Sequence, residues 1–241
     1  MIDTILFDLD GTLVQYSQEA FIEAYFAQLA KVFIGLGMEP ESSLKAVWDG
    51  TRAMARNDGT MLNTKRFWNS FAKAMNIPDD ALGAVEAACN NFYVNEFNEV
   101  KTIAIPNAIS QRIVRTMNCK GYTVVLATNP MFPECAVSTR LGWIGLELQD
   151  FLLVTHYANS TYCKPNHGYF HEILAKIDKL PEQCLMVGNH PVEDMVAGEL
   201  GTELFLVTDY LENEAEIDIT AFQKGTLKEL ETYLTMLPNL K

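Results

Sequence analysis

The chain has 241 residues, which is enough for one large domain or for a core domain that carries a smaller insert. Hydrophobic residues make up 49% of the chain and the formal net charge is -13, so we expect a packed core and a surface that repels polyanions such as nucleic acid. No apolar run approaches the roughly 18 residues that a spanning helix needs, so we expect no membrane partner. The five cysteines are scattered without CxxC spacing, so we expect reduced thiols in a cytoplasmic protein.

The first predicted element is a buried strand over residues 2–8, a short apolar run that ends in acidic residues and is followed by Gly11. From residue 15 to about residue 98 the pattern changes, because apolar residues recur three and four positions apart, as on one face of a helix. This spacing predicts four consecutive helices with no strand between them, over residues 20–33, 43–55, 65–75 and 80–97. Pro78 is expected to end the third helix and to open the fourth.

Beyond residue 101, short apolar runs alternate with helical patterns. The predicted strands cover residues 123–128, 152–155, 184–188 and 204–207, and the predicted helices cover 106–117, 132–141, 165–177 and 192–200. Such alternation is typical of a mostly parallel sheet with helices on both faces. We therefore predict an α/β fold, in which a Rossmann-like core domain (1–14 and 100–241) is interrupted after its first strand by a small all-helical domain (15–99). The acidic stretch 211–218 is predicted to be a solvated loop.

The strongest functional signal is the sequence ILFDLDGTLV over residues 5–14. Asp8 and Asp10 directly follow the first predicted strand, and in an open α/β sheet ligands bind at the carboxyl ends of the strands. Alternation places both carboxylates on one side of an extended segment, where they repel each other unless a cation or a shared proton relieves them. A turn that merely closes the strand is the structural alternative, but such a pair is costly to keep for structural reasons alone.

Four motifs in order make the chain similar to the haloacid dehalogenase (HAD) superfamily, and in particular to its phosphoglycolate phosphatase-like members. The four matches are DLDGT at 8–12, ATNP at 127–130, Lys164 in CKP, and VGNHPVEDMVAG at 187–198. The first of these is highly specific, whereas the threonine and lysine motifs are persuasive only in this order. The helical insert between the first two motifs resembles the family's C1-type cap. The resemblance covers the whole chain and implies a hydrolase with an aspartate nucleophile.

The resemblance also implies a role for each matching residue. Asp8 would be the nucleophile that forms an aspartyl-phosphate, and Asp10 would act first as general acid and then as general base. Thr128 and Asn129 would bind phosphoryl oxygens, and Lys164 would neutralise charge on Asp8 and on the phosphoryl group. The residues implied as ligands of a Mg2+ cofactor are Asp8, the backbone carbonyl of Asp10, Asn189 and Asp194.

The fourth motif departs from the family pattern at one position. The family usually has an aspartate where this chain has Asn189, so one negative charge is lost and metal affinity is expected to fall. Asp194 matches the later acidic residue of the motif and must then carry more of the electrostatics, usually without contacting the metal directly. His190 is expected to be an exposed loop histidine and not a ligand, because magnesium prefers oxygen.

The cap is expected to choose the substrate, since it closes over the core and its loops face the phosphoryl group. Candidate loops are 15–18 and 57–60, although their residues cannot be ranked from the sequence. Four aromatic residues at helical spacing are expected to form the core of the cap. These are Trp48, Phe67, Trp68 and Phe71.

The leading hypothesis is a magnesium-dependent phosphatase for a small phosphorylated metabolite, acting as a monomer or homodimer. The metal-free dehalogenating members of the superfamily lack the second aspartate of the first motif, so the presence of Asp10 favours phosphate over halide. A phosphomutase or a phosphonate hydrolase is the alternative enzyme; the latter often uses a cap lysine, for which Lys65 and Lys73 are available. A catalytically weak binding or regulatory protein is the alternative that Asn189 motivates.

Overall fold

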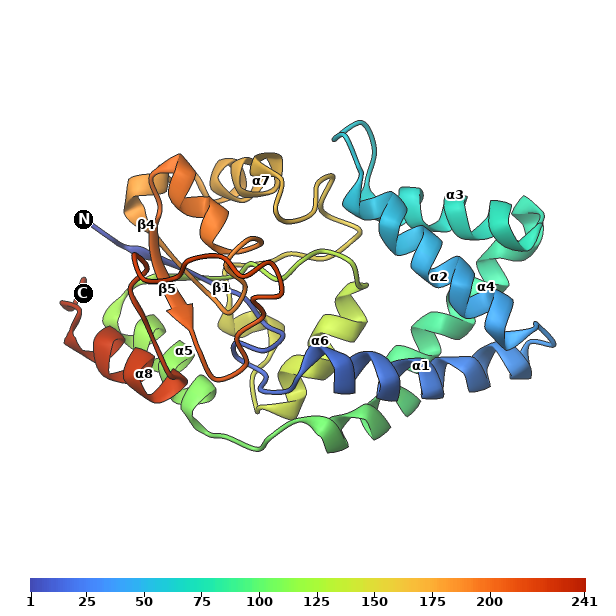
Figure 1. Cartoon of the computed structure of the whole chain (residues 1–241), viewed down its shortest axis with the longest axis horizontal. Helices are drawn as coiled ribbons and strands as arrows, with labels where there is room; N and C mark the ends of the chain where they lie inside the picture. The colour runs from blue at the N-terminus through green and yellow to red at the C-terminus, as the bar shows by residue number, and fades with distance from the viewer.

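A computed structural model describes all residues of the chain, 1–241. Its centre is a six-stranded, wholly parallel sheet in the order β3-β2-β1-β4-β5-β6. The strands are β1 (Thr4–Phe7), β2 (Thr123–Leu126), β3 (Leu153–Val154), β4 (Cys184–Gly188), β5 (Glu203–Val207) and β6 (Lys224–Gly225). The α/β architecture predicted from the alternating pattern is therefore confirmed, with the first strand at the centre of the sheet and both termini at the side of the molecule away from the cap helices (Figure 1).

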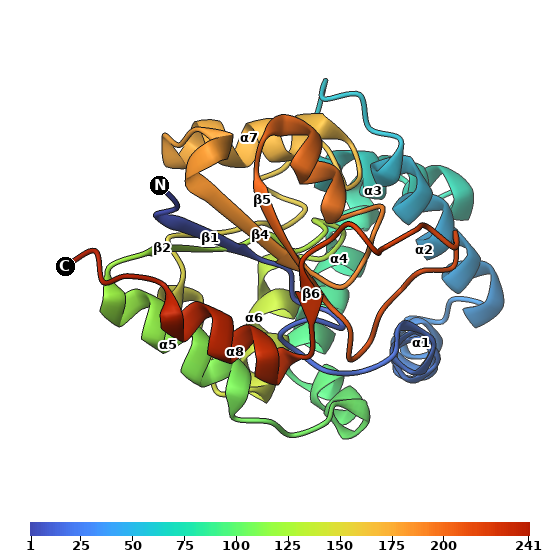
Figure 2. The same cartoon turned by 60° about the vertical axis from the view of Figure 1, so that its left-hand side comes forward.

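Helices cover both faces of the sheet, as Figures 1 and 2 show together. The helices of the core are α5 (Ile109–Lys120), α6 (Glu134–Trp143), α7 (His167–Ile177) and α8 (Leu227–Met236), with 3-10 segments η2 (Leu148–Asp150), η3 (Pro181–Gln183) and η4 (Met195–Leu200). Alternation along β1 divides the core, because Ile5 and Phe7 pack in the cluster that contains α5, α6 and α8, whereas Leu6 packs with α7. Both sets are fully buried, as a parallel sheet between two helical layers requires.

The segment between β1 and β2 is helical, as its three- and four-residue periodicity predicted. It contains α1 (Gln18–Gly35), α2 (Pro40–Ala55), α3 (Asn63–Met75), α4 (Asp79–Val94) and the 3-10 segment η1 (Glu96–Ile103). The first four of these helices extend from the carboxyl edge of the sheet to form the far end of the molecule (Figure 1). We refer to α1–α4 as the cap. The exact domain boundaries at residues 15–99 stay a prediction.

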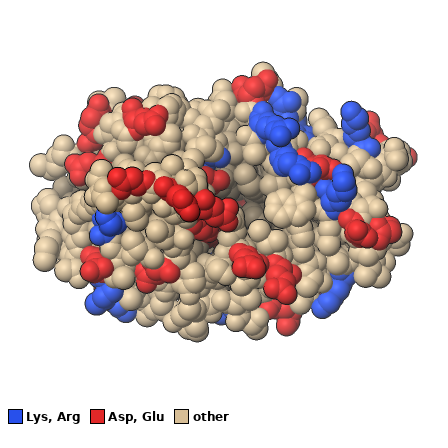
Figure 3. Space-filling model, viewed as in Figure 1, with Lys and Arg blue, Asp and Glu red and all other residues tan.

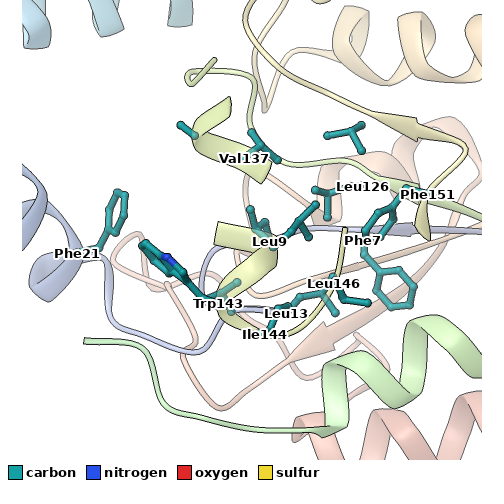
Figure 4. Packing of buried hydrophobic residues seen from close by; sticks show 14 of the residues in the cluster. Phe7, Leu9, Leu13, Phe21, Leu126, Val137, Trp143, Ile144, Leu146 and Phe151 are labelled. Carbon is teal, nitrogen blue, oxygen red and sulfur yellow. The ribbon is translucent and has the colours of Figure 1, made fainter. Parts of the chain in front are cut away.

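The cap and the core share one continuous hydrophobic cluster. Figure 4 shows Phe7 and Leu126 of adjacent strands packed with Phe151, while Trp143 of α6 reaches toward Phe21 of α1. Phe97 of η1 completes the junction, since its ring lies 5.3 Å from Trp143 and 6.2 Å from Phe21 between centroids. The cap therefore packs on the core through aromatic rings beside the first loop.

Several element boundaries differ from those predicted. The helices predicted to begin at the prolines at 106 and 165 begin two or three residues later, because the side chains of Asn107 and Asn166 accept hydrogen bonds from the first free amides. The helix predicted to reach residue 97 ends at Val94 and continues as η1, and the one predicted over 192–200 is the 3-10 segment η4. Strand β6 and helix α8 were not predicted.

No single helix combines the length and apolarity needed to cross a membrane; α1 and α2 reach that threshold only as a pair, and the pair is bent by 119°.

Candidate active site

The carboxyl ends of three neighbouring strands bring the sequence-predicted residues together. Phe7, the last residue of β1, is in register with Leu126 of β2 and Val187 of β4. The three chains therefore leave the sheet side by side, with Asp8, Thr128 and Asn189 one or two residues beyond that register. This edge borders a cavity of about 340 Å³. Its lining includes Asp8, Asp10, Thr128, Asn129, Asn189 and Asp194.

Lys164 lies between two carboxylates beneath this edge. Its Nζ donates to Asp8 Oδ1 at 2.8 Å and to Asp194 Oδ1 at 2.6 Å, and all three residues are buried. Burial favours the neutral amine, but Asp194 and Asp8 outweigh it and raise the pKa of Lys164 well above its usual range, so the ammonium stays charged. Burial raises the pKa of Asp8 to about 8, against the opposing effect of Lys164. One ammonium thus contacts two buried carboxylates, and it does not fully offset the desolvation of Asp8.

Asp194 is held on both of its oxygens. Oδ1 accepts from Lys164, and Oδ2 accepts from the backbone amide of His190 at 3.0 Å. Gly188 permits this close approach, because a Cβ at that position would collide with the Asp194 carboxylate. His190 is half-buried, contrary to the expected exposed loop residue, and its Nδ1 accepts from the amides of Val192 and Glu193. These hydrogen bonds from Val192 and Glu193 to the His190 ring hold the turn that leads to Asp194.

Asp10 is engaged by Tyr16, which lies in the candidate loop 15–18, and by Arg140, which the sequence did not indicate. The Tyr16 hydroxyl donates to Oδ1 and the Arg140 guanidinium forms an ion pair with Oδ2. Arg140 is fully buried on α6 and stacks on the ring of Phe132, with 4.4 Å from Cζ to the centroid. The side chain of Asp10 remains 33% exposed and borders the cavity. The carboxyl group is thus held by one partner on the cavity wall, Tyr16, and by one buried partner, Arg140, and it stays partly exposed to the cavity.

Asn189 occupies the position that departs from the family pattern, and its amide has a defined orientation. Oδ1 accepts from the Thr12 hydroxyl at 3.1 Å, and Nδ2 donates to the backbone oxygen of Tyr210 at 2.6 Å. Gly11, at φ 75°, passes directly beside this amide, and a Cβ there would collide with Nδ2. The amide is therefore built into the loop, with Nδ2 committed to a carbonyl that a carboxylate could not bind.

The loop after β2 is fixed by buried hydroxyl groups. The backbone oxygen of Thr128 accepts from Thr155 at 2.6 Å and from Tyr169 at 2.9 Å. Asn129 joins the third and fourth motifs, because its Oδ1 accepts from the Lys164 amide and its Nδ2 donates to Glu193 at 2.8 Å. These bonds leave the Thr128 side chain facing the cavity on a rigid support.

Two further acids, Glu193 and Glu212, line the same cavity. Burial raises the pKa of Glu193, and burial together with Asp10 raises the pKa of Glu212 to about 7. Glu212 belongs to the stretch 211–218 that was predicted to be a solvated loop, but the chain folds back over Asn189 and brings this residue to the site. In Figure 3 acidic side chains gather beside the hollow in the middle of the face. The site gathers more acidic side chains than its two buried cations can neutralise, so a bound cation would favour their ionised forms.

The oxygen donors fit magnesium chemically, although they are few. No group of three or more acidic, histidine or cysteine side chains is placed to hold a metal. Magnesium, however, is commonly held by one or two carboxylates together with water and substrate oxygens. Asp8, with Oδ2 free of protein hydrogen bonds, and the amide oxygen of Asn189, which accepts one hydrogen bond from Thr12, are suitable donors on the cavity wall, whereas both oxygens of Asp194 are engaged. A magnesium ion would therefore be held weakly by the protein alone.

Comparisons with known proteins point to one family. Residues 2–201 match the family model of haloacid dehalogenase-like hydrolases. Among curated proteins, none matches the sequence closely enough to count as a relative.

Solved structures of the same fold include enzymes of different activities. A predicted phosphoglycolate phosphatase from Haemophilus somnus 129PT has 17% identity and a TM-score of 0.56, over 96% of this chain and 97% of that one. A 2-haloacid dehalogenase from Pseudomonas syringae pv. tomato DC3000 has 17% identity and a TM-score of 0.64, over 98% and 99%. The HAD-hydrolase YfnB of Bacillus subtilis, bound to magnesium, has 18% identity and a TM-score of 0.56, over 98% and 99%. At these identities the likeness establishes the shared fold.

Proposed function

Because the chain belongs to the haloacid dehalogenase-like hydrolases, we propose that it is a magnesium-dependent phosphatase that forms an aspartyl-phosphate on Asp8. The observation that supports this most strongly is the ammonium of Lys164, held between Asp8 and Asp194 at the end of β1. A buried cation in contact with a carboxylate that borders a cavity is suited to a reaction that brings more negative charge to that carboxylate. Phosphoryl transfer to Asp8 is such a reaction.

In the first step, a carboxylate oxygen of Asp8 attacks phosphorus, and the bond between phosphorus and the ester oxygen breaks. Asp10 gives its proton to the departing alcohol, and the product is a phosphoryl group on Asp8. Thr128 and the backbone at Asn129 bind phosphoryl oxygens, and Lys164 neutralises charge on the acyl-phosphate. A bound magnesium ion would supply further positive charge near Asp8 and Asn189.

In the second step, Asp10 takes a proton from water, which attacks phosphorus and releases inorganic phosphate and the free Asp8 carboxylate. Tyr16 and Arg140 act here as positioning residues, because Tyr16 on the cavity wall and Arg140 outside the lining each bind one oxygen of Asp10. They fix the direction in which Asp10 can exchange a proton. The presence of this acid also favours phosphate esters over haloacids, since a halide leaving group needs no proton.

The test is release of inorganic phosphate from a panel of phosphorylated metabolites and p-nitrophenyl phosphate, with and without magnesium. Magnesium-dependent release that Asp8→Asn abolishes is the expected result. Release that persists in a correctly folded Asp8→Asn variant would overturn the mechanism.

A catalytically weak binding protein is the second candidate, and the contacts of two site residues favour it. The Asn189 amide is committed to Tyr210, and the Asp10 carboxylate is bound by Arg140 and Tyr16. Absence of phosphate release from every substrate, with the protein folded, would favour this reading. No comparable observation favours a phosphonate hydrolase, because neither Lys65 nor Lys73 lines the cavity.

A further inference from the structure

The cavity that begins at Asp8 continues deep into the cap. Of its 30 lining residues, 17 are hydrophobic, and those furthest from the sheet come from the cap helices. The helix α1 contributes Phe21, Tyr25, Leu29 and Phe33 to the lining, four residues apart in succession on one face. Phe21 and Tyr25 are 6% and 5% exposed, whereas Leu29 and Phe33 are each 1% exposed, so the inner end of this wall is closely packed. The volume of about 340 Å³ suits a small organic ligand. We call the part of the cavity lined by cap residues the cap chamber.

The wall of the cap chamber begins beside the acid that would protonate the leaving group. Tyr16, whose hydroxyl binds Asp10, stacks on Phe21 at 5.0 Å between centroids. Phe21 in turn stacks on Tyr25 at 5.7 Å. Three nearly parallel rings therefore lead from Asp10 into the cap. An alcohol that departs next to Asp10 has its carbon skeleton against these rings.

No charged side chain of the cap enters the chamber. Every charged residue of the lining belongs to the core motifs or the loop at Glu212, and all of these but His190 are acidic. Three basic residues of the cap pair with cap acids, Arg52 and Lys45 with Asp49 and Arg66 with Asp58. The others do not line the cavity either; they are Lys31, Arg56, Lys65 and Lys73. A carboxylate or second phosphate on the substrate would thus be buried without a counter-ion, near several acids.

The chamber also offers few groups to bind hydroxyls. The hydroxyls of Tyr25 and Tyr93 satisfy each other at 2.6 Å. Besides the tyrosines, Trp48 and Cys89, the polar groups of the cap that remain on the wall are the side chains of Gln18, Thr51 and Asn90 and the buried indole N–H of Trp68, which has no partner. A polyhydroxylated sugar would lose most of its hydrogen bonds to water on entry.

We propose that the chain acts on phosphate monoesters of uncharged, apolar alcohols, with an aromatic or long aliphatic group bound in the cap chamber; this rests on the proposed phosphatase function. The chamber selects the ester by burying apolar surface and excludes esters that have a second anionic group. Phosphoglycolate, whose leaving group has a carboxylate, is therefore expected to be a poor substrate.

The first experiment compares phosphate esters of primary alcohols, so that leaving-group chemistry stays nearly constant. The series is ethyl phosphate, hexyl phosphate, 2-phenylethyl phosphate and phosphoglycolate, with magnesium present. We expect kcat/KM to rise by about tenfold or more from the ethyl to the 2-phenylethyl ester, and phosphoglycolate to fall below the ethyl ester. Equal rates throughout, or a preference for phosphoglycolate, would overturn the chamber proposal while leaving the phosphatase function in place.

A binding experiment separates the two proposals if hydrolysis is absent. Trp48 and Trp68 line the chamber, so their fluorescence reports its occupancy. We expect 3-phenylpropylphosphonate to bind at least about tenfold more tightly than phosphonoacetate. Tighter binding of 3-phenylpropylphosphonate, together with no hydrolysis of any ester, would contradict the phosphatase function and support the chamber proposal. Equal binding of the two phosphonates would contradict the chamber proposal.

A positive charge placed inside the chamber should reduce the selectivity for the apolar ester over phosphoglycolate. Thr51 is half-buried on α2 and lines the chamber, whereas Ala55 is exposed on the same helix and does not. Thr51→Lys is expected to lower the ratio of kcat/KM for the 2-phenylethyl ester over phosphoglycolate by about tenfold. Ala55→Lys adds the same charge outside and should leave the ratio unchanged. Equal changes in both variants would contradict the proposal.

Discussion

Arg140 and Asp10, which are 130 residues apart in the sequence, form an ion pair behind the candidate active site. Arg140 is fully buried on α6, and its Nη2 has no hydrogen-bond partner in the protein. A guanidinium in this position depends on Asp10 for its compensating charge. The pair therefore ties the first catalytic loop to a helix that follows the second motif.

Removal of either partner should destabilise the fold more than removal of both. Arg140→Met is expected to lower the free energy of unfolding by about 2 kcal/mol, less than for a fully buried pair because Asp10 is partly exposed. Adding Asp10→Asn should recover part of that loss. Urea unfolding of the two single variants and the double variant measures the coupling. Strict additivity of the two losses would show that the ion pair contributes nothing.

Asp8→Asn should abolish turnover and stabilise the protein at alkaline pH. Burial raises the pKa of Asp8 to about 8, so the folded state favours the neutral acid, and stability present below about pH 4 is lost as the pH rises toward 8. The amide cannot ionise, and Lys164 keeps Asp194 as its partner. The thermal midpoints of variant and wild type, without metal, should be similar at pH 4 and diverge by pH 8. Parallel curves across that window would contradict this account.

Glu212→Gln should also stabilise the protein at alkaline pH, but by less than Asp8→Asn. Burial and the charge of Asp10 raise the pKa of Glu212 to about 7, so its contribution to stability is lost between about pH 4.5 and pH 7. At pH 8 the variant is expected to be more stable by about 1 kcal/mol, a value reduced because the side chain is partly solvated. Glu214→Gln, at an exposed neighbour, is the matched control and should change little. A pH-independent effect would exclude titration of Glu212 as the cause.

Asn189→Asp should lower the free energy of unfolding of the metal-free protein. A carboxylate cannot donate to the Tyr210 oxygen that Nδ2 now binds at 2.6 Å, and it adds charge beside Glu212. The expected loss is about 1–3 kcal/mol in the free energy of unfolding. Magnesium should stabilise this variant more than wild type, because the added carboxylate is a better ligand. Thermal unfolding across a magnesium titration measures both effects, and equal responses of the two proteins would show that this position does not contact the metal.

The sequence by itself determined the class of fold and the residues of the first motif. Alternation of short apolar runs with helical periodicity specifies strands between helices, since each pattern fits only one backbone geometry. DLDGT could be found because it directly follows a strand of recognisable pattern, whereas the three later motifs were matched through their order in the resemblance to the family. Helix starts were predicted less well, as at Asn107 and Asn166, because a side-chain cap competes with the preference of proline for the first turn.

Only the tertiary structure decided which other residues join the site. Arg140, Tyr16 and Glu212 lie in segments whose local pattern predicts a helix or a solvated loop, and nothing local indicates that Asp10 or Asn189 will be their partner. The cap aromatics likewise show helical spacing whether they fill a core or line a chamber. Hydrophobic periodicity predicts which face of a helix is buried, but it does not predict whether another side chain or a ligand covers that face. That distinction depends on how the helices pack around the cavity.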